Sequence, residues 1–485
     1  MNAQPLSAKA SSPKASSAMA SSAEDVTIVG GGAAGVLLAA HLAWSTDRPL
    51  RVTVIDGGPG RIGNGTAYRS TDPGHLLNVR AASMSAWHDQ PDHFVRWLAA
   101  TGNAARAGDF VARSTYGNYL TAVAYDACSG PLAHVRIVHC VATSVTRNAA
   151  VSRNDPGWRI RLTDGTELTS RHVVLATGIE APIPLPLTRR CLNEQQANDR
   201  YISDRYINDR CLNDPWRPGA LDSIDDDDPV LLIGTGLTAI DLATTLARTG
   251  RRITAVSRHG VLPAAHTLNQ RAPMACEEVP TNLRALRRYI HGRVAVSLAT
   301  TGDWRPAVDG LRPYTQGIWQ ALDDRDRYEF LRRDRRRWES ARHRMAPAVA
   351  ATIAALRASG QLEIRTGKLE IRTGNVEAAR DTWVINATGP NVDLTRSTNP
   401  VIRALFADRV IRRGSLGIGL DTTGDGQLRD PAGRRVPGLW TLGCTRRGQL
   451  WETTAIPEIR AQAHALAERL THQVRTRPRV LADAR

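Results

Sequence analysis

Three glycines at the spacing G-x-G-x-x-G stand near the start of the sequence, at Gly30, Gly32 and Gly35. They follow the apolar run 26–29 and precede an alanine-rich amphipathic segment, which predicts a strand, a tight turn and a helix. The first glycine permits the turn, the second lets backbone approach a pyrophosphate, and the third lets the helix pack on the strand. The next expected strand ends in Asp56, where a carboxylate can accept hydrogen bonds from a ribose hydroxyl. This segment predicts a site for FAD or NAD.

A second segment later in the chain repeats the spacing with Gly234, Gly236 and Ala239, again after a short apolar run. The strand expected after it ends in Ser257 and Arg258, so no carboxylate stands where the first segment has one. A guanidinium offers a two-pronged donor for a phosphate and no acceptor for a diol. The segment therefore predicts a nicotinamide nucleotide site that favours NADPH over NADH. The alternative is that Arg258 is a solvated loop residue.

Two apolar strands are expected to end in the tripeptide Ala-Thr-Gly, the first at Gly178 and the second at Gly389. Small residues there let backbone press against a nucleotide, and the glycine permits the exit turn. A third apolar strand ends at Gly443, and a helix is expected over 456–470. All three glycines are therefore predicted to lie at the cofactors, with Gly443 near the middle of an FAD.

These elements predict an α/β protein with two Rossmann-like dinucleotide-binding domains, in which an inserted NAD(P) domain makes the FAD domain discontinuous. The length of 485 residues suits two or three domains. The expected boundaries are 1–23 for a disordered tail, 24–185 for the first part of the FAD-binding domain, 186–228 for a linker or insertion with short repeats, 229–375 for the NAD(P)-binding domain with a helical arginine-rich portion, and 376–475 for the second part of the FAD-binding domain.

Two short repeats interrupt this plan. A five-residue unit recurs over 199–214, and because neither 3.6 nor 2 divides five, it predicts neither a clean helix nor a clean strand. The sequence alone does not decide whether this repeat is ordered. A seven-residue unit occurs twice over 362–375, which is too few copies for a solenoid.

The formal net charge of +16 comes almost wholly from arginine, since lysine occurs only at positions 9, 14 and 368. No nucleic-acid-binding motif accompanies the charge, so we expect no specific nucleic-acid partner. The basic run 330–344 is interrupted by acidic residues and predicts a solvated helix face rather than a binding patch.

Cysteine spacing and hydropathy indicate the cellular compartment in which we expect the protein. No two of the six cysteines form a close pair, which argues against a structural zinc site, a dithiol and a disulfide framework. We therefore expect no metal and a reducing, cytoplasmic setting. No apolar run reaches the length of a membrane span, and 1–23 lacks the apolar core of a secretory signal. The cysteines are Cys128, Cys140, Cys191, Cys211, Cys276 and Cys444.

The order of these motifs resembles that of flavoproteins with two dinucleotide-binding domains, such as glutathione reductase-like enzymes, flavin-containing monooxygenases and N-hydroxylating monooxygenases. Particular strings resemble the FAD/NAD(P)-binding family that includes bacterial FAD-dependent urate hydroxylases and aspartate N-monooxygenases. The resemblance covers about residues 25–470. The strings are HLLNVRAASMSAW, YGNYL, GTGLTAIDLA, SRHGVLP and LGCTRRGQLWETTAIPEIRAQA.

The resemblance assigns FAD binding to the first motif with Asp56 and Gly443, and nicotinamide nucleotide binding to the second motif with Arg258. Two departures stand out. Cys444 follows Gly443 where reductases often carry an acidic residue, so a ribityl hydrogen bond must come from elsewhere. No F-x-G-x-x-x-H motif lies near Gly178, as a flavin-containing or Baeyer–Villiger monooxygenase would show.

No catalytic triad is evident, which is expected where the flavin carries the chemistry. The candidates for contact with the flavin or substrate are His75, Asn78, Arg446, Arg447, Trp451 and Glu452. Their alternative roles are loop anchoring and core packing. Cys444 is interpreted as a small buried residue rather than a nucleophile.

The resemblance implies an FAD-dependent, NAD(P)H-driven monooxygenase that uses O₂ to hydroxylate a small polar, nitrogen-containing substrate through a C4a-hydroperoxyflavin. Urate-like purines and amino-acid amines are the leading substrate classes. One alternative is a flavin reductase or dehydrogenase that does not oxygenate. Another is a non-catalytic flavin- or nucleotide-sensing protein. The oligomeric state stays open.

Overall fold

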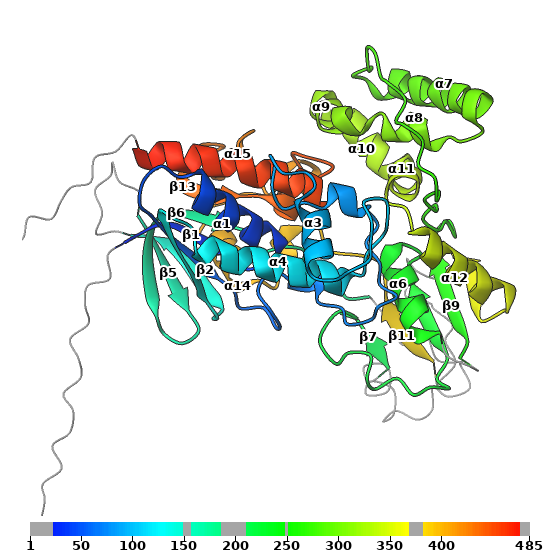
Figure 1. The fold of residues 1–485 in the computed structure, drawn as a ribbon, viewed down its shortest axis with the longest axis horizontal. Helices are drawn as coiled ribbons and strands as arrows, with labels where there is room; N and C mark the ends of the chain where they lie inside the picture. Colours follow the sequence, from blue (N-terminus) through cyan, green and yellow to red (C-terminus); the bar gives the residue numbers. More distant parts are fainter. Residues whose placement is uncertain (1–22, 149–156, 186–209, 248–250, 368–381, 476–485) are drawn as a thin grey trace, which may run out of the picture.

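The computed structural model describes residues 23–148, 157–185, 210–247, 251–367 and 382–475. Two sheets of mainly parallel strands lie side by side, and a group of helices stands apart from the second sheet (Figure 1). This arrangement confirms the predicted α/β class. The predicted tail 1–23 lies almost wholly outside the described residues.

The first sheet has the strand order β12-β13-β6-β1-β2-β3, and its central pairs are parallel. Its inner strands β1 and β2 are buried almost throughout because both faces of a parallel sheet are covered. Strand β5 forms the predicted antiparallel hairpin with β6 around the turn at Gly165, and β4 pairs antiparallel with the other edge of β5. The strands are β1 Glu24–Val29, β2 Leu50–Ile55, β3 Ala133–Val138, β4 Ala142–Arg147, β5 Trp158–Leu162, β6 Glu167–Leu175, β12 Gln427–Arg429 and β13 Arg435–Thr441.

Helices cover one face of this first sheet. They are α1 Ala33–Ser45, α4 Arg113–Cys128 and α15 Ile456–Arg475, and they share one buried apolar cluster with the strands. The other face carries α14 Pro400–Ala407 and the β4–β5 hairpin. Helix α15 and strand β13 come from the end of the chain, so the first sheet is completed by segments that flank the second one.

The second sheet is parallel throughout, with the order β10-β9-β8-β11-β7. Its core includes residues of α6 Leu237–Leu246 and α12 Pro347–Ala358. The strands are β7 Cys211–Leu212, β8 Val230–Ile233, β9 Ile253–Ser257, β10 Leu362–Thr366 and β11 Trp383–Asn386.

Two expectations about this sheet need correction. The return to the first domain was expected at residue 376, yet β11 pairs with β8 because its three buried apolar residues, 383–385, continue the second sheet's core. The five-residue repeat was expected to form no strand, yet its last copy supplies the short edge strand β7 beside β11. The earlier copies lie outside the described residues, as does the second copy of the seven-residue repeat.

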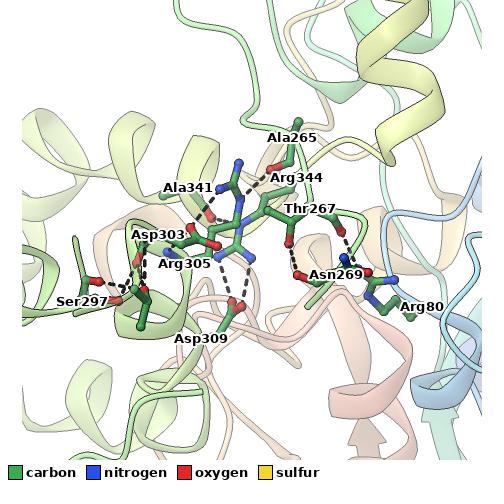
Figure 2. Close-up of polar contacts among 11 residues, drawn as sticks. Arg80, Ala265, Thr267, Asn269, Ser297, Asp303, Arg305, Asp309, Ala341 and Arg344 are labelled. Carbon is green, nitrogen blue, oxygen red and sulfur yellow. Dashed lines mark hydrogen bonds and ion pairs between the residues drawn. The ribbon is translucent and has the colours of Figure 1, made fainter. Parts of the chain in front are cut away.

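A helical unit spans 283–342 and is formed by α7 Leu283–Thr301, α8 Arg305–Asp309, α9 Thr315–Ala321, α10 Asp324–Arg333 and α11 Arg335–Arg342. Buried arginines hold it together (Figure 2). The Arg344 guanidinium donates two hydrogen bonds to Asp309, at 3.0 and 2.8 Å. Arg305 donates to Ala265 on the segment that leads into the helical unit. Arg80 donates to Thr267 on the same segment, and it belongs to the part of the chain built on the first sheet, which we call the first unit.

Short elements shape the connecting loops, and no helix in the described ranges is both long and apolar enough to span a membrane. The short elements are α2 Gly65–Tyr68, α3 His93–Ala100 and the 3₁₀ turns Ala81–Ser83, Arg312–Tyr314, Leu394–Arg396, Ser415–Gly417 and Gly443–Arg446.

Candidate functional site

The first glycine motif forms a tight turn between β1 and α1. Gly30 has a φ of +117°, and a β-carbon there would lie 2.2 Å from the carbonyl oxygen of Ala176 at the end of β6. A β-carbon at Gly35 would lie 2.0 Å from the Gly30 carbonyl oxygen. At Gly32 the nearest atom would be 3.6 Å away. The protein itself therefore requires the first and third glycines, whereas the second leaves space above the turn.

The second glycine motif repeats this geometry between β8 and α6. Gly234 has a φ of +130°, and a β-carbon there would lie 2.2 Å from the carbonyl oxygen of Ala387. At Gly236 the nearest atom would be a guanidinium nitrogen of Arg336, 3.7 Å away. Each Ala-Thr-Gly strand end thus closes directly on one glycine turn.

Helices α1 and α6 begin without a side-chain cap and without an acidic residue in the first turn. Three described helices have a capping side chain, Asn282 on α7, Asp323 on α10 and Asn399 on α14, whereas others such as α4 and α12 are uncapped like α1 and α6. The free N–H groups and the positive dipole end of an uncapped helix bind phosphate. Both turns therefore have the donors and the space that a pyrophosphate needs.

Asp56 lies against the first turn, since a β-carbon at Gly31 would be 2.5 Å from its β-carbon. Burial raises the pKa of Asp56, partly offset by the Gly58 N–H and by His139. No ion pair engages the Asp56 carboxylate within the described ranges, so it is free to accept from a ribose hydroxyl. Arg258 is exposed after β9, and no hydrogen bond or ion pair within those ranges engages its guanidinium.

The second turn opens into a cleft of about 680 Å³ that is lined by the second sheet, by the helical unit and by loops and helix ends of the first unit. Gly236, Arg258 and Gly389 line it, and a β-carbon at Gly389 would have no atom within 4 Å. The lining residues of the first unit include Tyr68 and Ile456 at the start of α15.

The structure separates the predicted substrate contacts. Asn78 and Arg447 line the cleft. His75 does not, because its Nδ1 lies 2.6 Å from the Ser70 hydroxyl and its Nε2 lies 2.7 Å from the Thr245 hydroxyl on α6. These contacts match the anchoring alternative, in which His75 ties a loop of the first unit to the second.

The adjacent residues Arg446 and Arg447 make different contacts. Arg446 is buried and donates to Gly424 and to Gln449, so it holds a loop, and burial lowers its pKa to about 10. Arg447 donates to Glu339 on α11 at 2.8 Å, and its guanidinium lies 4.6 Å from the ring centre of Trp451. Arg447 alone of this pair lines the cleft.

Gly443 and Cys444 lie beside the first turn. Gly443 has a φ of +75°, its N–H donates to Gln462 on α15, and a β-carbon there would lie 3.6 Å from that of Ala34 at the start of α1. Burial raises the pKa of the Cys444 thiol to about 11, so the thiolate needed of a nucleophile is disfavoured. Gly178 has a φ of +76° with no atom near its β-face.

Arg336 is a site residue that the sequence analysis missed. It donates to the Thr235 carbonyl oxygen at 2.8 Å and to the carbonyl oxygen of Val261, so it lies on the second glycine turn. The prediction that 330–344 is a solvated helix face is wrong at this position and at Arg344, which is 2% exposed. Arg336 is half-buried where α11 packs against the turn, and Arg344 is buried against Asp309 and Trp304. The charge pattern encodes neither of these tertiary contacts.

His343 was missed as well. It lines the cleft, and its Nε2 lies 3.4 Å from the buried carboxylate of Glu452, which also accepts from the Trp338 indole at 3.0 Å. Burial would raise the pKa of Glu452, but His343, Arg342 and the Trp338 hydrogen bond outweigh it and lower the pKa to about 2. Glu452 therefore stays ionised and fixes the orientation of His343.

Within the described ranges no group of three His, Cys, Asp or Glu residues is placed to hold a metal ion, and the five cysteines there are free thiols. The geometry is thus that of two nucleotide cradles, one bordered by a carboxylate and one by arginines.

Comparison with known proteins agrees with this geometry. Residues 27–180 match a protein family described as FAD-NAD(P)-binding. The chain has the fold of the two-dinucleotide-binding flavoproteins. An ornithine hydroxylase, PvdA of Pseudomonas aeruginosa, shares 14% identity at a TM-score of 0.58, with 93% of this chain and all of that chain (100%) covered. The ornithine N-hydroxylase of Kutzneria sp. 744 was solved with reduced FAD, NADP⁺ and L-ornithine. It shares 12% identity with this chain at a TM-score of 0.57, with 93% of this chain and 100% of that chain covered.

No curated protein sequence matches the chain. The family match nevertheless confirms that the segment containing the first motif is of an FAD/NAD(P)-binding type. At such low sequence identities the solved structures show the fold alone, and they confirm the predicted resemblance in fold.

Proposed function

We propose that the chain is an NADPH-driven, FAD-dependent monooxygenase that hydroxylates a small polar, nitrogen-containing molecule. FAD would lie along the first glycine turn with Asp56 and Gly443, and NADPH along the second with Arg258 and Arg336. The solved relatives of the same fold include hydroxylases of ornithine, an amino acid with a side-chain amine.

One observation carries the proposal: the nucleotide turns of two separate sheets are built alike, and the cleft at the second turn reaches the first unit. Each turn has a glycine that its own sheet requires, a second glycine with open space above it, and an uncapped helix behind it. The cleft beside the second turn is also lined by Tyr68, Arg447 and Ile456 of the first unit. A nicotinamide nucleotide in this cleft would therefore contact the unit that holds the first turn.

When bound, FAD would supply the redox chemistry that takes electrons from NADPH and activates O₂. The residues of the chain would bind, orient and exclude water. Arg258 and Arg336 would hold a phosphate of the nicotinamide nucleotide through charge-assisted hydrogen bonds. Asp56 would accept from a ribose hydroxyl of FAD.

The cleft supplies charged groups for a polar substrate. Arg113, held by Asp241 at 2.8 Å, and Arg447, held by Glu339, face it from the first unit. These guanidiniums suit the carboxylate of an amino acid or the anionic form of a purine. His343, oriented by Glu452, is placed to hold or release a proton at its cleft-facing side.

Oxygen incorporation tests this proposal. The purified, flavin-loaded protein would be given NADPH and isotopically labelled O₂ with ornithine, aspartate or urate in turn. We expect one of these classes to stimulate NADPH oxidation and to carry the label in its product. NADPH oxidation with no labelled product from any of them would favour the reductase alternative, and bound FAD without NADPH oxidation would favour the sensing alternative.

A further inference from the structure

A second cavity, of about 480 Å³, lies inside the helical unit, and we call it the apolar cavity. Helix α7 forms one wall with aliphatic side chains that include Leu286, Ile290 and Val294. Four of the chain's 11 tryptophans line the rest. They are Trp304, Trp319, Trp338 and Trp451. Its volume is that of sites that enclose small organic molecules.

Helix α11 separates the apolar cavity from the nucleotide cleft. Arg336 and Glu339 line the cleft, whereas Arg337, Trp338 and Ala341 line the apolar cavity. No lining residue is shared between the two. The apolar cavity is therefore a separate enclosure and not an extension of the nucleotide site.

The polar groups around the apolar cavity are unequally paired. Arg287 is neutralised by Glu329 at 2.7 Å and Asp334 at 2.6 Å. Arg337 is exposed, and in the part of the chain that the structure describes no carboxylate or hydrogen-bond acceptor engages its guanidinium. The one carboxylate that lines the apolar cavity, Asp334, is already engaged by Arg287. The apolar cavity therefore presents an unpaired positive charge beside an aromatic and aliphatic interior.

We propose that the apolar cavity binds a monocarboxylic acid with an apolar body, such as a medium-chain fatty acid. The carboxylate would pair with the Arg337 guanidinium, whose planar fork matches it. The chain would displace water from the tryptophan and α7 walls, which is the favourable term in such sites. An aliphatic amine would place its charge against Arg337 and is excluded, and a neutral alcohol would lack the ion pair.

Calorimetric titration of the purified full-length protein with sodium decanoate tests the proposal, with no NADPH present. We expect saturable binding of decanoate, weaker binding of decanol and none of decylamine. Arg337→Gln should weaken decanoate binding about tenfold, as the loss of one charge-assisted hydrogen bond implies, and leave decanol unchanged. Arg332→Gln, an equal charge change at an exposed position outside the cavity lining, should change neither.

A pair of variants on α7 tests the location. Val294→Phe, which fills the apolar cavity, should abolish decanoate binding, whereas Val296→Phe, at an exposed position of the same helix, should preserve it. Absence of decanoate binding, or binding that survives Val294→Phe and Arg337→Gln, overturns the proposal. So does a second copy of the chain on this face, seen in sedimentation as a dimer that decanoate does not dissociate. Because the titration needs no turnover, failure of the monooxygenase proposal would leave its outcome unaffected.

Discussion

At the scale of single residues, the glycines of the two motifs are needed for two different reasons. Gly30 and Gly234 have positive φ values and no room for a β-carbon, so the backbone of the chain itself demands them. Gly32 and Gly236 have no atom nearer than 3.6 Å to an added β-carbon, so the folded chain would tolerate alanine there. A ligand that presses on the turn explains why these positions are glycine as well.

This difference predicts opposite outcomes for two alanine variants. Gly30→Ala should lower the free energy of unfolding by about 2 kcal/mol or more, because the β-carbon meets the Ala176 carbonyl oxygen. Gly32→Ala should change it by no more than about 0.5 kcal/mol, yet reduce retained FAD. Thermal unfolding of the flavin-free proteins and flavin absorbance after purification check both. Full flavin retention by Gly32→Ala would contradict the placement of the pyrophosphate.

Arg258 predicts the choice of nicotinamide nucleotide. Arg258→Glu should lower the preference for NADPH over NADH at least about tenfold, because a carboxylate repels the phosphate that distinguishes NADPH. Steady-state KM values for the two nucleotides give the measurement. Arg252→Glu, at an exposed position just before β9, is the matched control for charge. An unaltered preference in Arg258→Glu would contradict our assignment of the second site.

At the scale of elements, α11 joins three parts of the molecule. Arg336 on this helix contacts the second glycine turn, Glu339 holds Arg447 of the first unit, and the Trp338 indole donates to Glu452. Positions 336, 338 and 339 point in different directions around a helix, so one short element reaches three neighbours. The position of α11 therefore fixes the charged groups of the cleft.

Glu452 at this junction predicts acid sensitivity. Its pKa falls from an ordinary value of 4.5 to about 2 in the folded protein, so its contribution to stability is complete above pH 4.5 and is lost as pH falls through 2. Glu452→Gln should therefore reduce the free energy of unfolding at neutral pH by roughly 2–3 kcal/mol and flatten its decline between those values. Denaturant titration across pH measures this. Glu468→Gln, at an exposed carboxylate, should behave as wild type, and an equally steep decline in Glu452→Gln would refute the argument.

Arg344 predicts how the helical unit is held. Arg344→Ala leaves the Asp309 carboxylate without its bidentate partner (Figure 2) and should cost about 3 kcal/mol of stability. The exposed Arg332→Ala should cost less than about 0.5 kcal/mol. Equal unfolding midpoints for the two variants in urea would show that the Arg344 pair does not stabilise the unit.

At the scale of the whole molecule, the sequence predicted the two nucleotide turns because strand, turn and helix are local and their glycine spacing is fixed by backbone sterics. It also predicted that the end of the chain completes the first sheet. It could not place Arg336 or His343, because their role depends on where the helical unit packs against both sheets. For the same reason the charge pattern could not distinguish the buried Arg344 from its solvated neighbours.

One chain holds both nucleotide turns, and the cleft at the second turn is lined in part by residues of the first unit. The central proposal is that a nicotinamide nucleotide bound at the second turn would reduce a flavin bound at the first. Anaerobic stopped-flow mixing of the flavin-loaded protein with NADPH or NADH tests that claim most directly. We expect rapid bleaching of the flavin absorbance by NADPH, slower bleaching by NADH, and loss of that difference in Arg258→Glu. A flavin that binds fully yet is not bleached by either nucleotide would contradict it.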